Sequence, residues 1–388
     1  MTPLALPAHP RILVVALRRL GDALFATPLI AAIRAAWPLA TIDALVFDDT
    51  AGILDGNPDL DGIVTMPVRR TALQGLALAL KLARRYDLAV STQSGDRPTA
   101  FALIAGRRHV GPIDRGLRGT LRKLALTRSV VAEPGRHRLE EMHCIVDALG
   151  IPRVGHLVCP RGDPERGRPA RSLSEDSGRD ARAPKAPYAV IHAAPKFVYK
   201  RWTRDGWRAL GAGLAERGLK IVATGGPAPE ERAFLDGVWH EHDITRLDGR
   251  LSWPQIAALI AGARLYVGPD TSVTHLAAAS GCPTVALYGP TDPRLWGPVP
   301  ADGLDPMWEA RGTIQQRGNV WLVQNPQPCQ PCHNEGCDRH LLSHSRCLDE
   351  LTSAQVLRAV DAALASCGTQ PLATAQGTGQ SHRVGTGT

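Results

Sequence analysis

Several charged or hydroxyl-bearing residues that could bind a ligand or transfer a proton lie just after short apolar runs, where a predicted strand ends and a helix begins. The run 265–267 is followed within three residues by Asp270 and Thr271, either of which can cap a helix that extends to about residue 280. At such a strand exit, free N–H groups and the positive end of the helix dipole favour an anion such as a phosphate. The alternative is that Asp270 and Thr271 only cap the helix and that His275 only packs within it.

Asp22 and Lys200 stand at two other strand exits. Asp22 follows the apolar run 11–17, where a carboxylate can cap the first helix or act as a general base towards an acceptor hydroxyl. If Asp22 is only a cap, Asp96 is the next carboxylate to consider as the base. Lys200 follows the apolar run 188–192, and with the 270–271 helix start it suits a nucleotide diphosphate.

Strands and helices alternate in both halves of the chain, which predicts two doubly wound α/β units. Residues 161–187 are almost entirely polar or small and cannot build a core, so they are predicted to be an interdomain linker, disordered in part. The predicted organisation is a first domain over 1–160, the linker over 161–187, a second domain over 188–350, a closing helix over 351–366 and a disordered tail over 367–388.

The composition and charge of the chain indicate which kinds of molecule it binds. The 388 residues carry a formal charge of +8, mostly from arginine, which suits phosphate or carboxylate groups. Aromatic residues make up only 5% and no nucleic-acid-binding motif is present, so an anionic lipid surface or a small anionic substrate is the better expectation. Arg18, Arg19, Arg107 and Arg108 are candidates for an anionic acceptor, and a solvated basic face is the alternative.

Known fingerprints and targeting signals are missing from the sequence. It has no dinucleotide-binding glycine fingerprint, no Walker A loop and no nucleophile elbow, which argues against redox, ATPase and hydrolase functions. No apolar run is long enough to span a bilayer and the first residues do not resemble a signal peptide, so we expect a cytoplasmic protein.

Four cysteines lie close together near the end of the second domain. In a reducing compartment such a cluster favours a structural zinc or iron ion over disulfides, although disulfides and simple burial remain alternatives. The four candidate ligands are Cys329, Cys332, Cys337 and Cys347.

Jointly, the motifs of this chain resemble those of the ADP-heptose:lipopolysaccharide heptosyltransferases, glycosyltransferase family 9. The resemblance covers most of residues 11 to 365 in order. The matching segments are Leu20–Asp22, Thr27–Pro28, Lys200–Trp202, Gly225–Pro227, Gly268–Thr271, His275–Ala278 and Gly289–Asp292.

This resemblance implies a GT-B fold, in which two Rossmann-like domains face a central cleft and the closing helix crosses back to the first domain. The first domain would bind the acceptor and the second the nucleotide sugar. The implied reaction is an inverting transfer of heptose from ADP-heptose to a lipopolysaccharide inner-core acceptor, without a catalytic metal. The enzyme would work in the cytoplasm, as a peripheral protein at the inner membrane.

The resemblance also assigns roles. Asp22 matches the catalytic base, and Lys200 the lysine that neutralises the departing diphosphate. Ser272 stands where the family usually has a glycine. The glutamate that binds the ribose would be Glu230, with Glu231 as the second candidate. Asp270, Thr271 and His275 match donor-site positions, and the candidate donor-binding set is Lys200, Glu230, Leu251, Asp270, Thr271, Ser272 and His275. The candidate acceptor-binding residues, which rest on the density of basic residues in the first half and not on the resemblance, are Arg18, Arg19, Arg107 and Arg108.

Two alternatives stay open on this basis. Some relatives with such a cysteine cluster modify proteins and bind iron, so the acceptor could instead be a protein. A GT-B module that binds a nucleotide without catalysis is the other alternative, and the presence of both Asp22 and Lys200 argues against it.

Overall fold

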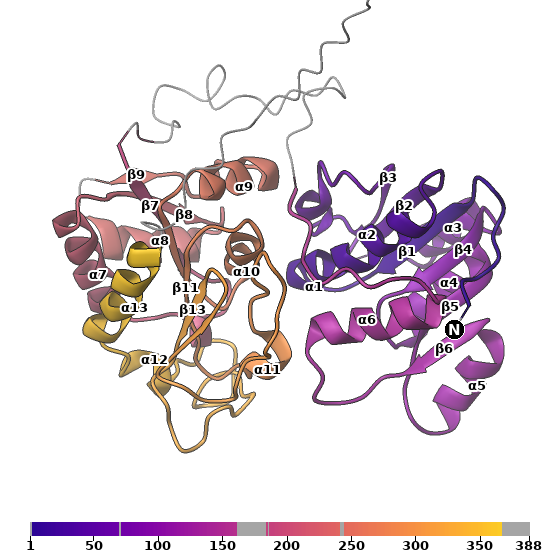
Figure 1. Ribbon diagram of the computed structural model, residues 1–388. Coiled ribbons are helices and arrows are strands. Elements are labelled where there is room, and N and C mark those ends of the chain that lie inside the picture. The colour runs from indigo at the N-terminus through magenta and orange to yellow at the C-terminus, as the bar shows by residue number, and fades with distance from the viewer. Residues whose placement is uncertain (1, 70, 161–183, 185, 241–243, 367–388) are drawn as a thin grey trace, which may run out of the picture.

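The computed structural model describes residues 2–69, 71–160, 184, 186–240 and 244–366. Two sheets, each flanked by helices, lie side by side (Figure 1). Most of the predicted linker and all of the predicted tail lie outside the described residues. Within the described ranges, no helix is both long enough and apolar enough to cross a membrane.

The first sheet is parallel throughout its described strands, in the order β3-β2-β1-β4-β5-β6. Its centre is β1, whose residues after Arg11 are all buried, as expected of a strand covered on both faces. The order reverses between β1 and β4, and ligands bind at the carboxyl ends of strands beside such a reversal. The strands are β1 (Arg11–Ala16), β2 (Thr41–Phe47), β3 (Gly62–Met66), β4 (Tyr86–Ser91), β5 (Gly106–Ile113) and β6 (Arg128–Val131).

Helices cover both faces of this sheet. Residues of α2 and α6 pack together on one face, and those of α3 and α4 form a separate core on the other. The helices are α1 (Leu20–Phe25), α2 (Thr27–Ala36), η1 (Ala51–Leu54), α3 (Ala72–Leu82), α4 (Asp96–Ala105), α5 (Leu117–Ala125) and α6 (Arg138–Leu149).

The second sheet has the order β12-β13-β11-β10-β7-β8-β9, with β12 alone antiparallel to its neighbour among the described strands. Here the order reverses between β7 and β10, so the carboxyl ends of these two strands form the second predicted ligand edge. The strands are β7 (Tyr188–Ala194), β8 (Lys220–Gly225), β9 (Thr245–Arg246), β10 (Leu265–Pro269), β11 (Thr284–Leu287), β12 (Ile314–Arg317) and β13 (Val320–Val323). The helices are η2 (Val198–Lys200), α7 (Arg204–Glu216), α8 (Pro229–Trp239), α9 (Trp253–Ala261), α10 (Ser272–Ala279), α11 (Pro293–Trp296), α12 (Arg346–Asp349) and α13 (Ser353–Ser366).

The closing helix α13 packs on the second domain, against α7 and strands β10, β11 and β13. The expectation that it crosses back to the first domain is therefore wrong for the described residues. Its buried residues fall on one face of the helix, and that face packs entirely into the core of the second domain. Arg217, directly after the end of α7, also donates from Nε and Nη2 to the carboxylate of Asp361 in α13, at 2.6 and 2.9 Å.

The two domains meet through α1 and α10. The Phe25 ring of α1 lies edge-on to His275 of α10, with centroids 5.0 Å apart, and also contacts the rings of His137 and Trp296. His137 places Nε2 2.9 Å from the carbonyl oxygen of Gly297 in the second domain, while its Nδ1 accepts a hydrogen bond from the Leu139 N–H. These contacts bring the carboxyl ends of both sheets to face each other.

Candidate active site

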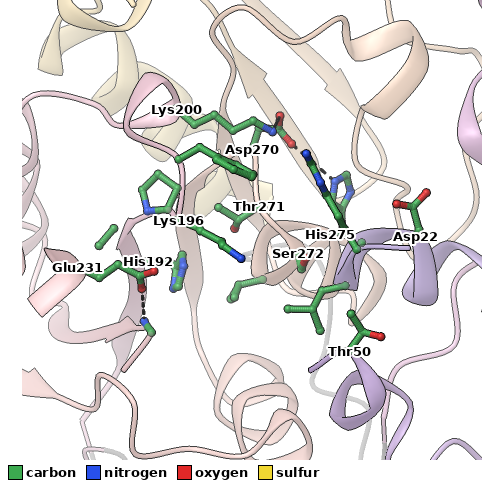
Figure 2. Close-up of a pocket in the computed structure, with 18 of the residues that line it drawn as sticks. Asp22, Thr50, His192, Lys196, Lys200, Glu231, Asp270, Thr271, Ser272 and His275 are labelled. Carbon is green, nitrogen blue, oxygen red and sulfur yellow. Dashed lines mark hydrogen bonds and ion pairs between the residues drawn. The ribbon is translucent and has the colours of Figure 1, made fainter. Parts of the chain in front are cut away.

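A cleft of about 1180 Å³ lies between the domains, at the strand ends identified above. Figure 2 shows Asp22 and Thr50 of the first domain on one side and His192, Lys196 and Glu231 of the second on the other. Its size suits a ligand larger than a typical small metabolite, since common ligand pockets have volumes of about 300–1,000 Å³.

Asp22 lies in the first turn of α1 and lines the cleft, although only 6% of its surface is exposed. Its Oδ1 is 3.1 Å from Nε of the buried Arg138 and 3.6 Å from a terminal nitrogen of Arg18. Arg138 is itself fixed, because it donates to the Thr92 carbonyl at 3.2 Å and pairs with Glu141. Asp22 is thus a carboxylate held between two guanidinium groups at the cleft wall.

Asp96, the alternative base, does not reach the cleft. It stands at the start of α4 with its carboxylate in solvent, where the hydrogen bond from Arg122 lowers its pKa. Asp49, which follows β2, is a further carboxylate that lines the cleft from the first domain. Asp49 is therefore a better rival to Asp22 than Asp96.

Lys200 and Asp270 form an ion pair at the wall of the second domain. Lys200 ends the short helix η2 and donates from Nζ to Oδ2 of Asp270 at 2.5 Å. Burial alone would raise the pKa of Asp270, but Lys200 and the neighbouring His275 outweigh it and hold that pKa below its usual value. Because an ammonium has three donors and Lys200 uses one here, it can still donate to a ligand in the cleft.

The helix α10 begins at the cleft and is capped by Thr271, whose hydroxyl accepts a hydrogen bond from the Thr274 N–H. Asp270 does not cap the helix, so its carboxylate is available to Lys200. The hydroxyl of Ser272 lies against Gly21 of α1, 3.7 Å from the position that a Cβ would take there. Ser272 therefore sits where the two domains approach each other.

His275 is almost fully buried one turn into α10 and also lines the cleft. Burial lowers its pKa to about 4, so the ring is neutral at neutral pH. Its Nε2 lies 3.8 Å from Oδ1 of Asp270, and its Nδ1 has no hydrogen-bond partner among the described residues. Because buried polar atoms are nearly always hydrogen-bonded, the unpaired Nδ1 of His275 is a candidate to bind a polar group beside the cleft.

The structure separates the predicted acceptor arginines into two pairs. Arg18 and Arg19 line the cleft, and the Arg19 guanidinium stacks over the Phe197 ring of the second domain, 4.9 Å from its centroid. Arg107 and Arg108 do not line it, because they occupy the amino end of β5, at the opposite edge of the sheet. Their prediction as acceptor ligands is corrected accordingly.

The order of preference between the two glutamates is reversed. Glu231 lines the cleft and accepts a hydrogen bond from the Gly226 N–H at 2.8 Å, whereas Glu230 does not line it. Pro229 is the first residue of α8, which makes Glu231 the third, and its side chain turns back to the strand exit at Gly226. Burial raises the pKa of Glu231, and the hydrogen bond from Gly226 partly offsets this. Leu251, the remaining predicted donor residue, also lines the cleft.

Several cleft residues were not predicted as site residues. Asp49 and Thr50 follow β2, and the polar run after that strand was a usable signal. His333, Asn334 and Glu335 come from the loop between Cys332 and Cys337. No local pattern places this loop at the cleft, since it returns there only through the packing of the second domain.

The four clustered cysteines carry free thiols, and among the described residues no group of three or more metal-binding side chains is arranged to hold an ion. The four thiols are nevertheless neighbours. Burial, together with the nearby thiols of the other three cysteines, raises the pKa of the Cys347 thiol to about 12. The metal site thus stays a prediction. The residues concerned are Cys329, Cys332, Cys337 and Cys347.

Comparison with known proteins identifies the family. The model of Glycosyltransferase family 9 (heptosyltransferase) matches residues 76–328, well over half of the chain. The chain belongs to this family. Lipopolysaccharide heptosyltransferase 1 of Pseudomonas aeruginosa is 28% identical over 360 residues, covering 89% of this chain and 93% of that protein. Lipopolysaccharide heptosyltransferase 3 of Escherichia coli is 25% identical over 288 residues, covering 72% and 83% of the two chains.

The fold agrees with this family 9 assignment. The solved structure of the E. coli heptosyltransferase WaaC with ADP superposes with a TM-score of 0.67 at 21% identity, covering 91% of this chain and 99% of that one. The predicted α/β GT-B class, with two Rossmann-like domains, is thereby confirmed. The protein is a glycosyltransferase of the heptosyltransferase family.

Proposed function

We propose that this enzyme transfers heptose from ADP-heptose to an inner-core acceptor of lipopolysaccharide, with inversion at the anomeric carbon. The observation that carries the proposal is the arrangement of the cleft, in which Asp22 on one domain faces Lys200 and the start of α10 on the other. The family and the names of its lipopolysaccharide heptosyltransferases support the sugar and the acceptor class.

The second domain supplies the features that an ADP-sugar needs. The diphosphate would lie at the start of α10, where backbone N–H groups and the helix dipole favour negative charge. Lys200 would neutralise the charge that grows on the leaving phosphate as its bond to the sugar breaks. Glu231, beside the Gly226 turn, would accept hydrogen bonds from the ribose hydroxyls.

Asp22 supplies the base on the acceptor side. In an inverting displacement the acceptor oxygen attacks the anomeric carbon while the bond to the diphosphate breaks, and the hydroxyl proton must leave directly to a nearby group. Asp22 would take this proton while Arg138 and Arg18 keep its carboxylate in place. Arg18 and Arg19 would also bind anionic groups of the acceptor. No step of this scheme requires a divalent ion.

The acceptor would be lipid-linked and reached at the cytoplasmic face of the inner membrane. The alternative is a protein acceptor, and one observation favours testing it. The cysteine-containing loop contributes His333, Asn334 and Glu335 to the cleft, where they would contact whatever molecule fills the space beside the donor.

The test is a transfer assay with the purified enzyme, ADP-heptose and an inner-core acceptor that lacks the heptose, reading out ADP release and product mass. Asp22→Asn keeps the size of the side chain, so ADP binding should survive while turnover falls by roughly 10²-fold or more. Asp49→Asn is the matched control and should keep near-normal turnover. Normal turnover in Asp22→Asn would show that Asp22 is not the base. Transfer to protein acceptors alone would replace the lipid-linked acceptor with the alternative.

A further inference from the structure

The helix α5 carries a row of leucines that the structure leaves in solvent. Leu117, Leu121 and Leu124 are 86%, 67% and 80% exposed. They are spaced four and three residues apart, so on a helix with about 100° between successive residues they form one narrow stripe. Single exposed leucines are ordinary, but a continuous stripe is an interaction surface.

The stripe points away from the domain because the opposite side of α5 is fixed to it. Gly119 is the one buried residue of the helix, and a Cβ there would come within 1.6 Å of the Asp114 carbonyl oxygen. Arg122 reaches from the helix to both Asp96 and Asp114. These anchors set the rotation of α5 about its axis, so the leucines cannot turn inwards without breaking them.

Exposed cations border the stripe on α5 and just before it. Arg118 and Lys123 flank the leucines on the two sides of the helix, and Arg115 precedes it. None of the three forms an ion pair with any residue in the described ranges, unlike the anchoring Arg122. An apolar stripe between cations is the pattern of a helix that lies in the interface of an anionic membrane.

A second stripe extends the same side of the first domain. Leu73, Leu76 and Leu80 of α3 are also exposed, with Lys81 beside them. The α3 and α4 helices cover one face of the sheet, and α5 follows α4 in the same direction along the sheet, which places it on that face. In Figure 1 the three helices run down one side of the domain.

From these observations we propose that the α3–α5 side of the first domain is a docking surface for an anionic lipid membrane, with the leucines of α5 inserted between head groups and the flanking cations at the lipid phosphates. A convex row of leucines fits a deformable lipid surface better than a peptide, which needs a groove. The cations would repel those of a second copy of the chain. Because α5 starts just after the carboxyl end of β5, the surface borders the edge of the sheet that carries Asp22.

This inference rests on the proposed function, because an enzyme with a lipid-linked acceptor has to work at a membrane surface. Its test uses neither donor nor acceptor, so a failure of transfer and a failure of docking can be told apart. The full chain is sedimented with vesicles of phosphatidylglycerol and phosphatidylethanolamine, and with vesicles of phosphatidylcholine alone. We expect binding to the anionic vesicles that weakens as salt is raised, since exposed charges are screened.

Two variants test the surface. Replacing Leu117, Leu121 and Leu124 together with Ser should weaken binding to anionic vesicles by roughly tenfold or more, because the inserted apolar area is lost. Replacing Leu341 and Leu342, which are exposed in the second domain, with Ser is the matched control and should change nothing. Calorimetry with ADP should give wild-type affinity in both variants, which establishes that they are folded.

The charge variant replaces Arg115, Arg118 and Lys123 with Gln and should remove most of the salt dependence. Vesicle binding that is unchanged in the leucine variant, or no binding of the wild type to anionic vesicles, overturns the proposal. A wild-type dimer that the leucine variant dissociates in sedimentation velocity would also overturn it, since the stripe would then be a self-association surface.

Discussion

The ion pair between Lys200 and Asp270 has two separable roles, structural and ligand-binding, and a double-mutant cycle distinguishes them. Removing one partner of a buried ion pair typically costs about 3–5 kcal/mol, because a charge is left without its counterion. The Lys200 side chain keeps 19% exposure and that of Asp270 8%. We therefore expect Lys200→Met to lower the free energy of unfolding by about 3 kcal/mol, at the lower end of that range.

Adding Asp270→Asn removes the stranded charge, so the double variant should recover most of the lost stability. Affinity for ADP should not recover, because the diphosphate still lacks a charge-assisted hydrogen bond worth about 1.5–3 kcal/mol, which is roughly tenfold to more than a hundredfold in the dissociation constant. Urea denaturation measures the first quantity and calorimetry with ADP the second. Lys220→Met, at the amino end of β8, removes the same charge far from the cleft and is the control.

The two outcomes of this cycle are distinct. If the double variant regains both stability and ADP affinity, Lys200 serves only to neutralise Asp270 and our assignment of Lys200 to the diphosphate is refuted. If stability does not recover, Lys200 does not stabilise the fold by neutralising Asp270. The loss of ADP affinity in the single variant then cannot be attributed to a lost contact with the diphosphate.

Two further predictions follow from the cysteines and the domain interface. Protein purified anaerobically should contain about one equivalent of zinc or iron, measured by elemental analysis, and a preparation that contains neither ends the metal hypothesis. The four ligands concerned are Cys329, Cys332, Cys337 and Cys347. Burial lowers the pKa of His137 from 6.5 to about 4, so the stability it contributes is present above pH 6.5 and lost as pH falls towards 4. Between pH 6.5 and 5 His137→Asn should therefore lose about 1.6 kcal/mol less unfolding free energy than the wild type, since the histidine of the unfolded chain is already half protonated at pH 6.5. An equal pH dependence of the two unfolding free energies, each measured by urea denaturation, would contradict this.

The sequence was sufficient to predict the fold class and the residues at strand exits. Asp22, Lys200 and Asp270 follow apolar runs, and parallel strands necessarily bring their carboxyl ends to one edge. Which of the two adjacent glutamates lines the cleft could not be predicted, because it depends on the exact start of α8.

The density of charged residues and their order along the chain did not predict which side chains reach the cleft. Arg107 and Arg108 belong to a basic stretch, but charge does not reveal that they begin a strand and so lie at the far edge of the sheet. The loop that carries His333 reaches the cleft through tertiary packing, for which no local pattern exists. The α5 leucines have helical spacing, and only the rotation imposed by Gly119 and Arg122 shows that they face solvent.

The interface between the domains sets the distance over which the proposed reaction would occur. Asp22 and Phe25 lie on the same short helix, and His275 lies on the helix whose start would bind the diphosphate. The contact of the Phe25 and His275 rings therefore links the helix that carries the proposed base to the helix that carries the proposed leaving-group site. Because burial keeps His275 neutral, the ring can pack against Phe25 without bringing an unpaired charge into the interface. A polar substitution at Phe25 would thus act on turnover through the separation of base and leaving group, although Phe25 itself would play no part in proton transfer.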